Sequence, residues 1–179
     1  MKGLPAPLLL LLATTGCGYN AGFRLDELGI RTVGLEIATN LTFRQRLEFF
    51  LTRQVQKELE SRVRTELAPP GRADALLQVS ILRASEPVLS EGVDDTISVG
   101  SLALTVTARL VRRRTGEVIK ETQLADREEF FIATGETVTE AATGVSTKIA
   151  RRLVLFLDPE IEKLAKWRGP QSPGDEKEP

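Results

Sequence analysis

The sequence predicts an α+β fold: a two-layer sandwich in which two long helices cover one face of a four-stranded mixed sheet. Two segments repeat apolar residues at steps of three and four, as helices with one buried face do. Four segments alternate apolar and polar residues, as strands with one buried face do. Their order along the chain is β-α-β-β-β-α. One-sided helices and a one-sided sheet bury their apolar faces against each other, which gives two layers.

The first 16 residues have the composition of a removable signal. Lys2 supplies a positive charge, and the apolar core of residues 8–13 is far shorter than the about 20 residues that span a membrane. Thr15 and Gly16 are small residues before Cys17, the only cysteine of the chain. An ordinary thiol behind a secretory signal is the alternative, but a lone cysteine in an exported chain has no disulfide partner. We expect acylation of Cys17, with the acyl chains holding the protein at a membrane.

The residues after the cysteine predict the location and the boundaries of the domain. Gly18 stands where lipoproteins of the inner membrane commonly carry Asp, which favours the outer membrane of a Gram-negative-type bacterium. Residues 17–31 show no clear period and predict a lipidated tether. The domain is expected at 32–167, a length that suits one hydrophobic core. Residues 168–179 consist largely of Pro, Gly and charged residues, and we expect a disordered tail.

The first predicted strand is followed by a long helix. Val33, Leu35 and Ile37 alternate with other residues and predict a strand that ends at Asn40. The helix should begin with a capping box at residues 42–45, Thr-Phe-Arg-Gln. Its apolar stripe comprises Phe43, Leu47, Phe50, Leu51, Val55, Leu59, Val63 and Leu67. Ala68-Pro69-Pro70-Gly71 ends it, because proline cannot continue the hydrogen-bond ladder.

The second strand follows the sequence Ala73-Asp74-Ala75. Leu77, Val79 and Ile81 alternate with polar residues, and the strand should run to about Ser85. Pro87 ends it or marks an edge. Residues 90–95 are polar and acidic and predict a loop. If the first two strands are parallel in one sheet, their connection through the helix should be right-handed.

The next two strands should form a long hairpin. In its first strand, the alternating apolar residues stand at odd positions before Gly100 and at even positions after it. This change predicts a bulge near Gly100. Residues 112–116 form the turn, in which Gly116 is free to take a positive φ. The returning strand runs from Val118 to about Ala125. Arg112, Arg113 and Arg114 lie at the tip, either as a solvated turn or as an anion site.

A second helix closes the predicted sandwich. Thr137-Val138-Thr139-Glu140 has capping-box spacing, and the apolar stripe comprises Val138, Ala142, Val145, Ile149, Leu153 and Phe156. Gly144 weakens this helix by roughly 1 kcal/mol relative to alanine, which indicates close packing at that position. Asp158-Pro159 should cap a short helix that reaches about Trp167.

Composition excludes several classes of function. The net charge is −1 with 24 basic and 25 acidic residues, so no overall field favours nucleic acid. The chain has no histidine, which removes the common metal ligands and nucleophile pairs. We find no glycine-rich phosphate loop and no paired-carboxylate motif. The sequence therefore predicts a protein that is not an enzyme and that uses no cofactor and no metal.

Several of these features together resemble the LptE family of lipopolysaccharide-assembly lipoproteins. They are Cys17-Gly18-Tyr19, the strand end near Asn40, the helix from Thr42, the segment 73–77, and the hairpin before a closing helix. The strand end Ile37-Ala38-Thr39-Asn40 departs from the Phe-x-Asn-x-Thr type of many relatives.

The resemblance implies a binding and assembly role. Proteins of this family sit inside the LptD β-barrel, help it to fold and bind lipopolysaccharide during delivery to the outer leaflet. Arginine suits such a ligand because it contacts phosphates through two hydrogen bonds. Arg112, Arg113 and Arg114 are the candidate lipopolysaccharide-binding residues, although the sequence does not select them over Arg151 and Arg152.

Two other classes stay open. One is an envelope scaffold or regulator, such as a peptidoglycan-synthase activator or a CsgG-like secretion component, which would have a different partner. The other, an envelope hydrolase, is disfavoured because the chain has no histidine.

Overall fold

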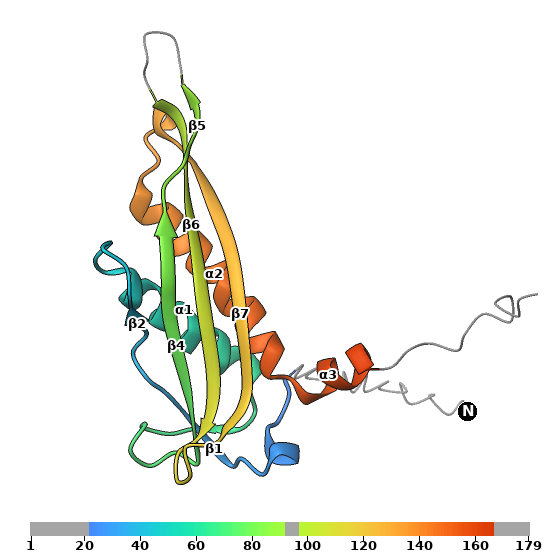
Figure 1. Cartoon of the computed structure of the whole chain (residues 1–179). Coiled ribbons are helices and arrows are strands. Elements are labelled where there is room, and N and C mark those ends of the chain that lie inside the picture. Colours follow the sequence, from blue (N-terminus) through green and yellow to red (C-terminus); the bar gives the residue numbers. More distant parts are fainter. Residues whose placement is uncertain (1–21, 92–96, 167–179) are drawn as a thin grey trace, which may run out of the picture.

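The computed structural model describes residues 22–91 and 97–166, and it confirms the predicted α+β class and element order (Figure 1). Two helices pack on one face of a curled mixed sheet. The main elements are β1 (Thr32–Leu35), α1 (Leu47–Arg62), β4 (Ala75–Ser85), β6 (Ile97–Arg112), β7 (Val118–Phe131) and α2 (Val138–Leu157). The predicted signal, the acylated Cys17 and the tail at 168–179 lie outside the described residues.

The sheet has more strands than the four predicted. Three short strands join it: β2 (Thr39–Asn40), β3 (Glu66–Leu67) and β5 (Val88–Glu91). β1 pairs in parallel with β4 and with β3, and β2 also pairs in parallel with β4. β4, β6 and β7 form an antiparallel set, and β5 pairs with β6 beyond the end of β4. β5 occupies the first part of the predicted loop at 90–95, whose remainder lies outside the described residues.

The first strand is shorter than predicted, and its inward face changes. β1 ends at Leu35, and the chain pairs again only at β2. The amide of Ala38 donates to the Oγ1 of Thr52 on α1 at 2.9 Å, and Ala38 is buried. Ile37, predicted to be buried, is 67% exposed. The break between β1 and β2 thus moves the inward position from Ile37 to Ala38.

The predicted start of the first helix at Thr42 is wrong, since α1 begins at Leu47. Asn40 Oδ1 accepts hydrogen bonds from the amide of Thr42 at 3.0 Å and from its hydroxyl at 2.8 Å. Asn and Thr side chains often form such local turns in competition with helix. Arg46 then takes a left-handed backbone conformation with a φ of 73°. Phe43, expected on the buried stripe, is consequently fully exposed.

The predicted helix end at Leu67 is also wrong. α1 ends at Arg62, whose carbonyl accepts from the amide of Phe23 at 3.0 Å. The amide of Arg64 donates to the carbonyl of Phe23 at 2.8 Å. A segment 40 residues earlier in the chain therefore draws residues 63–67 out of the helix into extended structure.

That segment belongs to the fold, so the predicted tether is wrong for residues 22–31. Leu25 and Ile30 are fully buried in the core. The amide of Leu25 donates to the buried Oγ1 of Thr65 at 2.7 Å. A short 3₁₀ helix, η1 (Asp26–Leu28), lies between the two buried side chains. The domain therefore includes residues 22–31, which lie before the predicted boundary at residue 32.

The long hairpin follows the prediction at its turn and extends beyond it at its end. Gly116 has a φ of 73°, as expected. β7 continues past Ala125 to Phe131. Against β7, the register of β6 runs unbroken through Gly100, so the predicted bulge is absent on that side. The register does shift nearby on the β5 side.

The second helix confirms its sequence signals. Thr137 Oγ1 accepts from the amide of Glu140, and the Glu140 carboxylate accepts from the amide of Thr137, which completes the capping box. A Cβ at Gly144 would lie 2.7 Å from Cδ of Glu128, so the predicted close packing is present. The short helix α3 (Pro159–Lys166) begins after Asp158, whose Oδ1 accepts from the amide of Glu160 at 2.9 Å.

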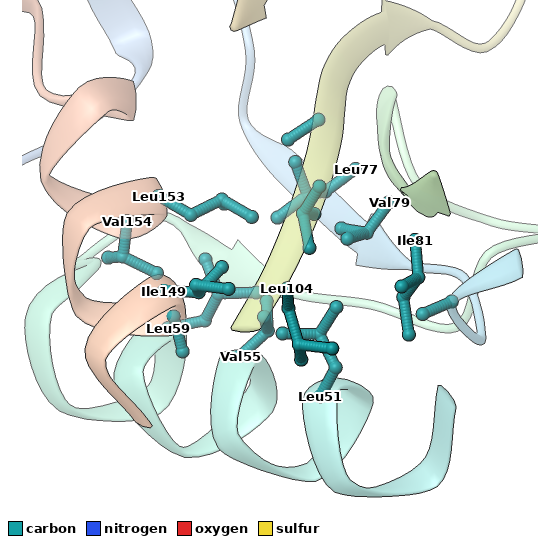
Figure 2. Packing of buried hydrophobic residues seen from close by; sticks show 14 of the residues in the cluster. Leu51, Val55, Leu59, Leu77, Val79, Ile81, Leu104, Ile149, Leu153 and Val154 are labelled. Carbon is teal, nitrogen blue, oxygen red and sulfur yellow. The ribbon is translucent and has the colours of Figure 1, made fainter. Parts of the chain in front are cut away.

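The core lies between the sheet and the two helices (Figure 2). Buried side chains of α1 and α2 meet the inward faces of β4 and β6. The largest contributors include Leu51, Leu59, Leu77, Ile81, Leu104, Ile149 and Leu153. These positions match the predicted stripes, which is why the fold class was correct despite the shifted ends of α1.

Candidate functional site

Neither a metal-holding cluster nor a membrane-spanning helix is found among the described residues. No cluster of three or more His, Cys, Asp or Glu that could hold a metal ion occurs within 22–91 and 97–166. Over the same ranges, no helix is long and apolar enough to cross a membrane.

The hairpin tip is anchored by two of its three arginines. Arg113 donates from Nε to the carbonyl of Ala73 at 2.6 Å, and its amide donates to the carbonyl of Asp74 at 2.9 Å. Arg112 donates from Nη2 to the carbonyl of Leu28 at 3.3 Å. Arg114 is exposed and has no hydrogen bond or ion pair within the described parts of the chain. Arg112 and Arg113 thus stabilise the fold, and the guanidinium group of Arg114 is the one most available to a ligand.

The contacts of Asp74 show why an acidic residue stands in the Ala73-Asp74-Ala75 sequence. Its Oδ2 accepts from the amides of Arg31 at 3.1 Å and Thr32 at 3.2 Å. Thr32 Oγ1 accepts in return from the amide of Asp74 at 2.8 Å. The hydrogen bond from the Arg31 amide, more than any other contact, lowers the pKa of Asp74. The carboxylate therefore joins the starts of β1 and β4 beside the hairpin tip.

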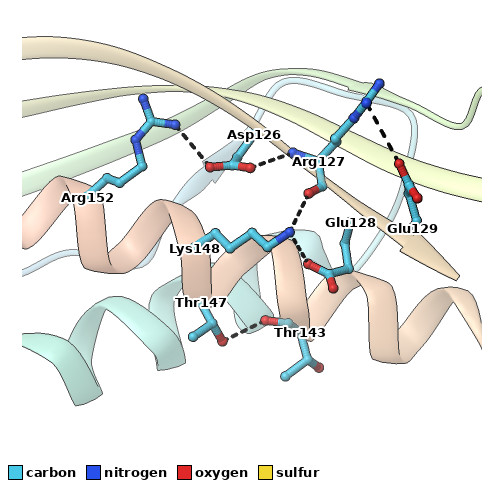
Figure 3. Close-up of polar contacts among 8 residues, drawn as sticks. All are labelled: Asp126, Arg127, Glu128, Glu129, Thr143, Thr147, Lys148 and Arg152. Carbon is cyan, nitrogen blue, oxygen red and sulfur yellow. Dashed lines mark hydrogen bonds and ion pairs between the residues drawn. The ribbon is translucent and has the colours of Figure 1, made fainter.

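The second arginine pair predicted from the sequence lies on α2 (Figure 3). Arg152 Nη1 donates to the carbonyl of Ala125 at 2.9 Å and pairs with Asp126 at 3.0 Å. One turn earlier, Lys148 donates to the carbonyl of Arg127 at 3.0 Å and pairs with Glu128. Arg151 is exposed and has no ion pair with any described residue. Arg152 is thus held against β7 and is a poorer ligand site than Arg114.

The hydrogen bond from Lys148 to Glu128 strengthens the contact between α2 and β7. The two atoms of the ion pair, Nζ and Oε2, are 2.8 Å apart. This hydrogen bond is the main reason that the pKa of Lys148 is raised. The ion pair between Lys148 and Glu128 therefore links α2 to β7.

Five exposed apolar side chains come from the segment between β1 and α1, from the first turn of α1 and from β4. They are Ile37, Leu41, Phe43, Phe49 and Leu82, with exposed fractions of at least 41%. Leu41 reaches β4 because its amide donates to the carbonyl of Ile81 at 3.0 Å. We call these five residues the apolar patch. Exposed apolar side chains mark a binding surface where they are contiguous.

Asn40 fixes the turn that carries Leu41 and Phe43, two residues of the apolar patch. Its Nδ2 donates to the carbonyl of Arg44 and to Oε2 of Glu48, both at 2.7 Å. Sequence patterns missed this surface because Ile37 and Phe43 fitted buried stripes. The Asn40-Leu41-Thr42 sequence, which favours a turn over a helix start, was the signal that could have revealed it.

A family model matches most of the chain. The model of the LptE family, described as lipopolysaccharide-assembly, matches residues 30–156. Comparison with curated protein sequences gives no match.

Several solved structures are similar to this chain at low sequence identity. A Xanthomonas campestris protein is 11% identical with a TM-score of 0.55, over 77% of this chain and 89% of that one. Lipoprotein B from Nitrosomonas europaea is 16% identical with a TM-score of 0.43, over 75% and 88%. PelC from Paraburkholderia phytofirmans, a dodecamer, is 16% identical with a TM-score of 0.43, over 72% and 88%. At 11% identity, the likeness to the Xanthomonas campestris protein shows a shared fold and nothing about function.

Proposed function

Because this chain belongs to the LptE lipopolysaccharide-assembly family, we propose that it is an outer-membrane lipoprotein that binds an LptD-like β-barrel and helps to assemble it. The observation that carries the proposal is the family match over residues 30–156, most of the described domain. The LptE family is non-enzymatic. The proposal therefore concerns binding surfaces, and acylated Cys17 would hold them at the membrane.

The apolar patch is the proposed contact with the barrel. Phe43 is fully exposed in the free domain, so its whole side chain is available for burial. Complete burial of one such side chain contributes about 1.5–3 kcal/mol. The hydrogen bonds of Asn40 fix the chain beneath the patch, which lowers the entropy lost when a partner binds.

The hairpin tip is the proposed contact with lipopolysaccharide. Arg112, Arg113 and Arg114 bring three guanidinium groups to one turn, and arginine pairs with phosphate through two hydrogen bonds. Because Arg112 and Arg113 also bind backbone carbonyls, Arg114 is the residue whose replacement tests the ligand contact without disturbing the fold.

The test is affinity capture from detergent-solubilised outer membranes, followed by mass spectrometry and lipopolysaccharide quantification. The wild-type chain should capture a large β-barrel together with lipopolysaccharide. Leu41→Asp with Phe43→Asp should lose the barrel, whereas Val118→Asp with Ile161→Asp, two exposed apolar residues outside the patch, should retain it. Arg114→Glu should lower the bound lipopolysaccharide and leave the barrel in place.

Other outcomes would contradict parts of the proposal. Capture of a peptidoglycan synthase or of a homo-oligomeric ring, without a barrel, would replace it with the scaffold or secretion class. Unchanged lipopolysaccharide in Arg114→Glu and in the combined Arg112→Glu, Arg113→Glu, Arg114→Glu variant would remove the hairpin tip from the ligand site.

A further inference from the structure

Three segments far apart in the sequence meet at the end of the molecule that carries the hairpin tip (Figure 1). They are residues 22–31, residues 64–74 and residues 112–117. Arg112 joins the first and third through the carbonyl of Leu28, and Arg113 joins the second and third through the carbonyl of Ala73. Together they contain seven arginines and five carboxylates. This end is therefore basic, although the whole chain has a net charge of −1.

A groove of about 600 Å³ lies between the first two of these segments. Its charged lining consists of Arg24, Arg31, Arg64, Asp26 and Glu66. Arg24 pairs with Asp26 at 2.5 Å. Arg31 and Arg64 are exposed and form no ion pair with any residue that the structure describes. We call this the tether-side groove, and these two arginines supply its available positive charge.

The groove lies where the chain leads back toward Cys17. A Cβ placed on Gly22 would be only 2.6 Å from Nε of Arg64, so this guanidinium packs directly against the first described residue. Five residue steps separate Cys17 from Gly22, and a fully extended chain of that length spans at most about 17 Å. Acyl chains on Cys17 would therefore hold the tether-side groove within reach of the lipid headgroups.

We propose that the tether-side groove binds the phosphate-bearing headgroups of anionic glycerophospholipids in the leaflet that holds the acyl chains. The inference rests on the acylation in the proposed function, and it assigns Arg31 and Arg64 a role apart from barrel and lipopolysaccharide binding. Arginine next to an anionic membrane surface gains energy from the surface potential and from direct phosphate contacts. The groove then orients the domain on its anchor, with the basic end toward the leaflet.

The test measures vesicle binding by the mature chain, residues 17–179, with Cys17→Ser so that acyl chains do not dominate. Vesicles of phosphatidylcholine with 30% phosphatidylglycerol are compared with vesicles of phosphatidylcholine alone, at about 20 mM salt. The expected result is binding to the anionic vesicles that 0.5 M salt removes. Arg31→Glu with Arg64→Glu should lower the partition coefficient roughly 30-fold or more, the effect of losing two surface cations.

The matched control is Arg53→Glu with Arg83→Glu, two exposed arginines outside the groove and without an ion pair to described residues. It carries the same change in net charge and should bind clearly more tightly than the groove variant. If the groove variant does not fold, Arg31→Gln with Arg64→Gln, set against Arg53→Gln with Arg83→Gln, gives the same charge-matched comparison. Equal binding by groove and control variants, or equal binding to both kinds of vesicle, would overturn the inference. Neither result would affect barrel capture, so failure here is separate from failure of the proposed function.

Discussion

Replacement of Gly100 by alanine tests the packing that closes the far end of the hairpin. Gly100 on β6 lies directly opposite Phe130 on β7. A Cβ at Gly100 would lie 2.5 Å from Cζ of Phe130, 2.9 Å from Cε2 and 3.0 Å from Cε1. The ring is 7% exposed and belongs to the core, so it has little room to move. Overpacking of this kind costs about 1–3 kcal/mol.

Phe130→Leu removes the three crowding ring atoms and keeps the side chain apolar. In that background the new methyl group has space, and alanine is favoured over glycine in a strand by about 0.5–1 kcal/mol. Gly100→Ala should therefore destabilise the wild-type chain and be neutral or stabilising in Phe130→Leu. The expected coupling free energy is about 2 kcal/mol, well above the roughly 0.5 kcal/mol error of additivity.

Urea unfolding of the four proteins, followed by circular dichroism, measures this coupling. With an m value of about 2 kcal/mol per molar, Gly100→Ala should lower the midpoint by about 1 M in the wild type. Equal midpoint shifts in both backgrounds would show that the ring does not restrict position 100, and would refute the argument from the geometry.

Three further predictions concern capping, surface and pH. Thr137→Ala should cost about 1 kcal/mol in thermal unfolding, because it removes the side-chain half of the capping box on α2. Phe43→Asp should change the free energy of unfolding by less than about 0.5 kcal/mol, because the side chain is fully exposed; a larger loss would mean that it packs within the domain. The lowered pKa of Asp74 contributes stability that is complete well above pH 3.8, its ordinary value, and is lost as the pH falls below it. Asp74→Asn should therefore reduce the acid-induced loss of stability measured between pH 5 and about pH 2.

The sequence predicted best where local and tertiary preferences agree. On α2, the capping box at Thr137 and the stripe through Ile149 both place the helix correctly, and nothing elsewhere in the chain competes for those residues. On α1, only the central stripe through Leu51 and Val55 was reliable. Both of its ends shifted because other groups bind the same backbone: Asn40 at the start and Phe23 at the end.

The candidate site was predictable only in part, for the same reason. The arginine run at the hairpin tip is visible in the sequence, but the structural roles of Arg112 and Arg113 depend on carbonyls 84 and 40 residues away. The tether-side groove joins Arg31 to Arg64, which are 33 residues apart in the sequence, so no local pattern reveals it. The apolar patch was hidden because Phe43 has the correct helical spacing but lies before the helix begins.

The cations of α2 also affect how other chains can approach β7. Within the described sheet, β7 pairs only with β6, so its other side has free backbone groups. Arg152 and Lys148 already occupy the carbonyls of Ala125 and Arg127 on that side. A foreign strand would have to displace both cations before it could add to the sheet there. Any strand-built partner, including the barrel of the proposed function, would therefore meet this middle stretch of β7 through side chains, because the two cations oppose strand addition there.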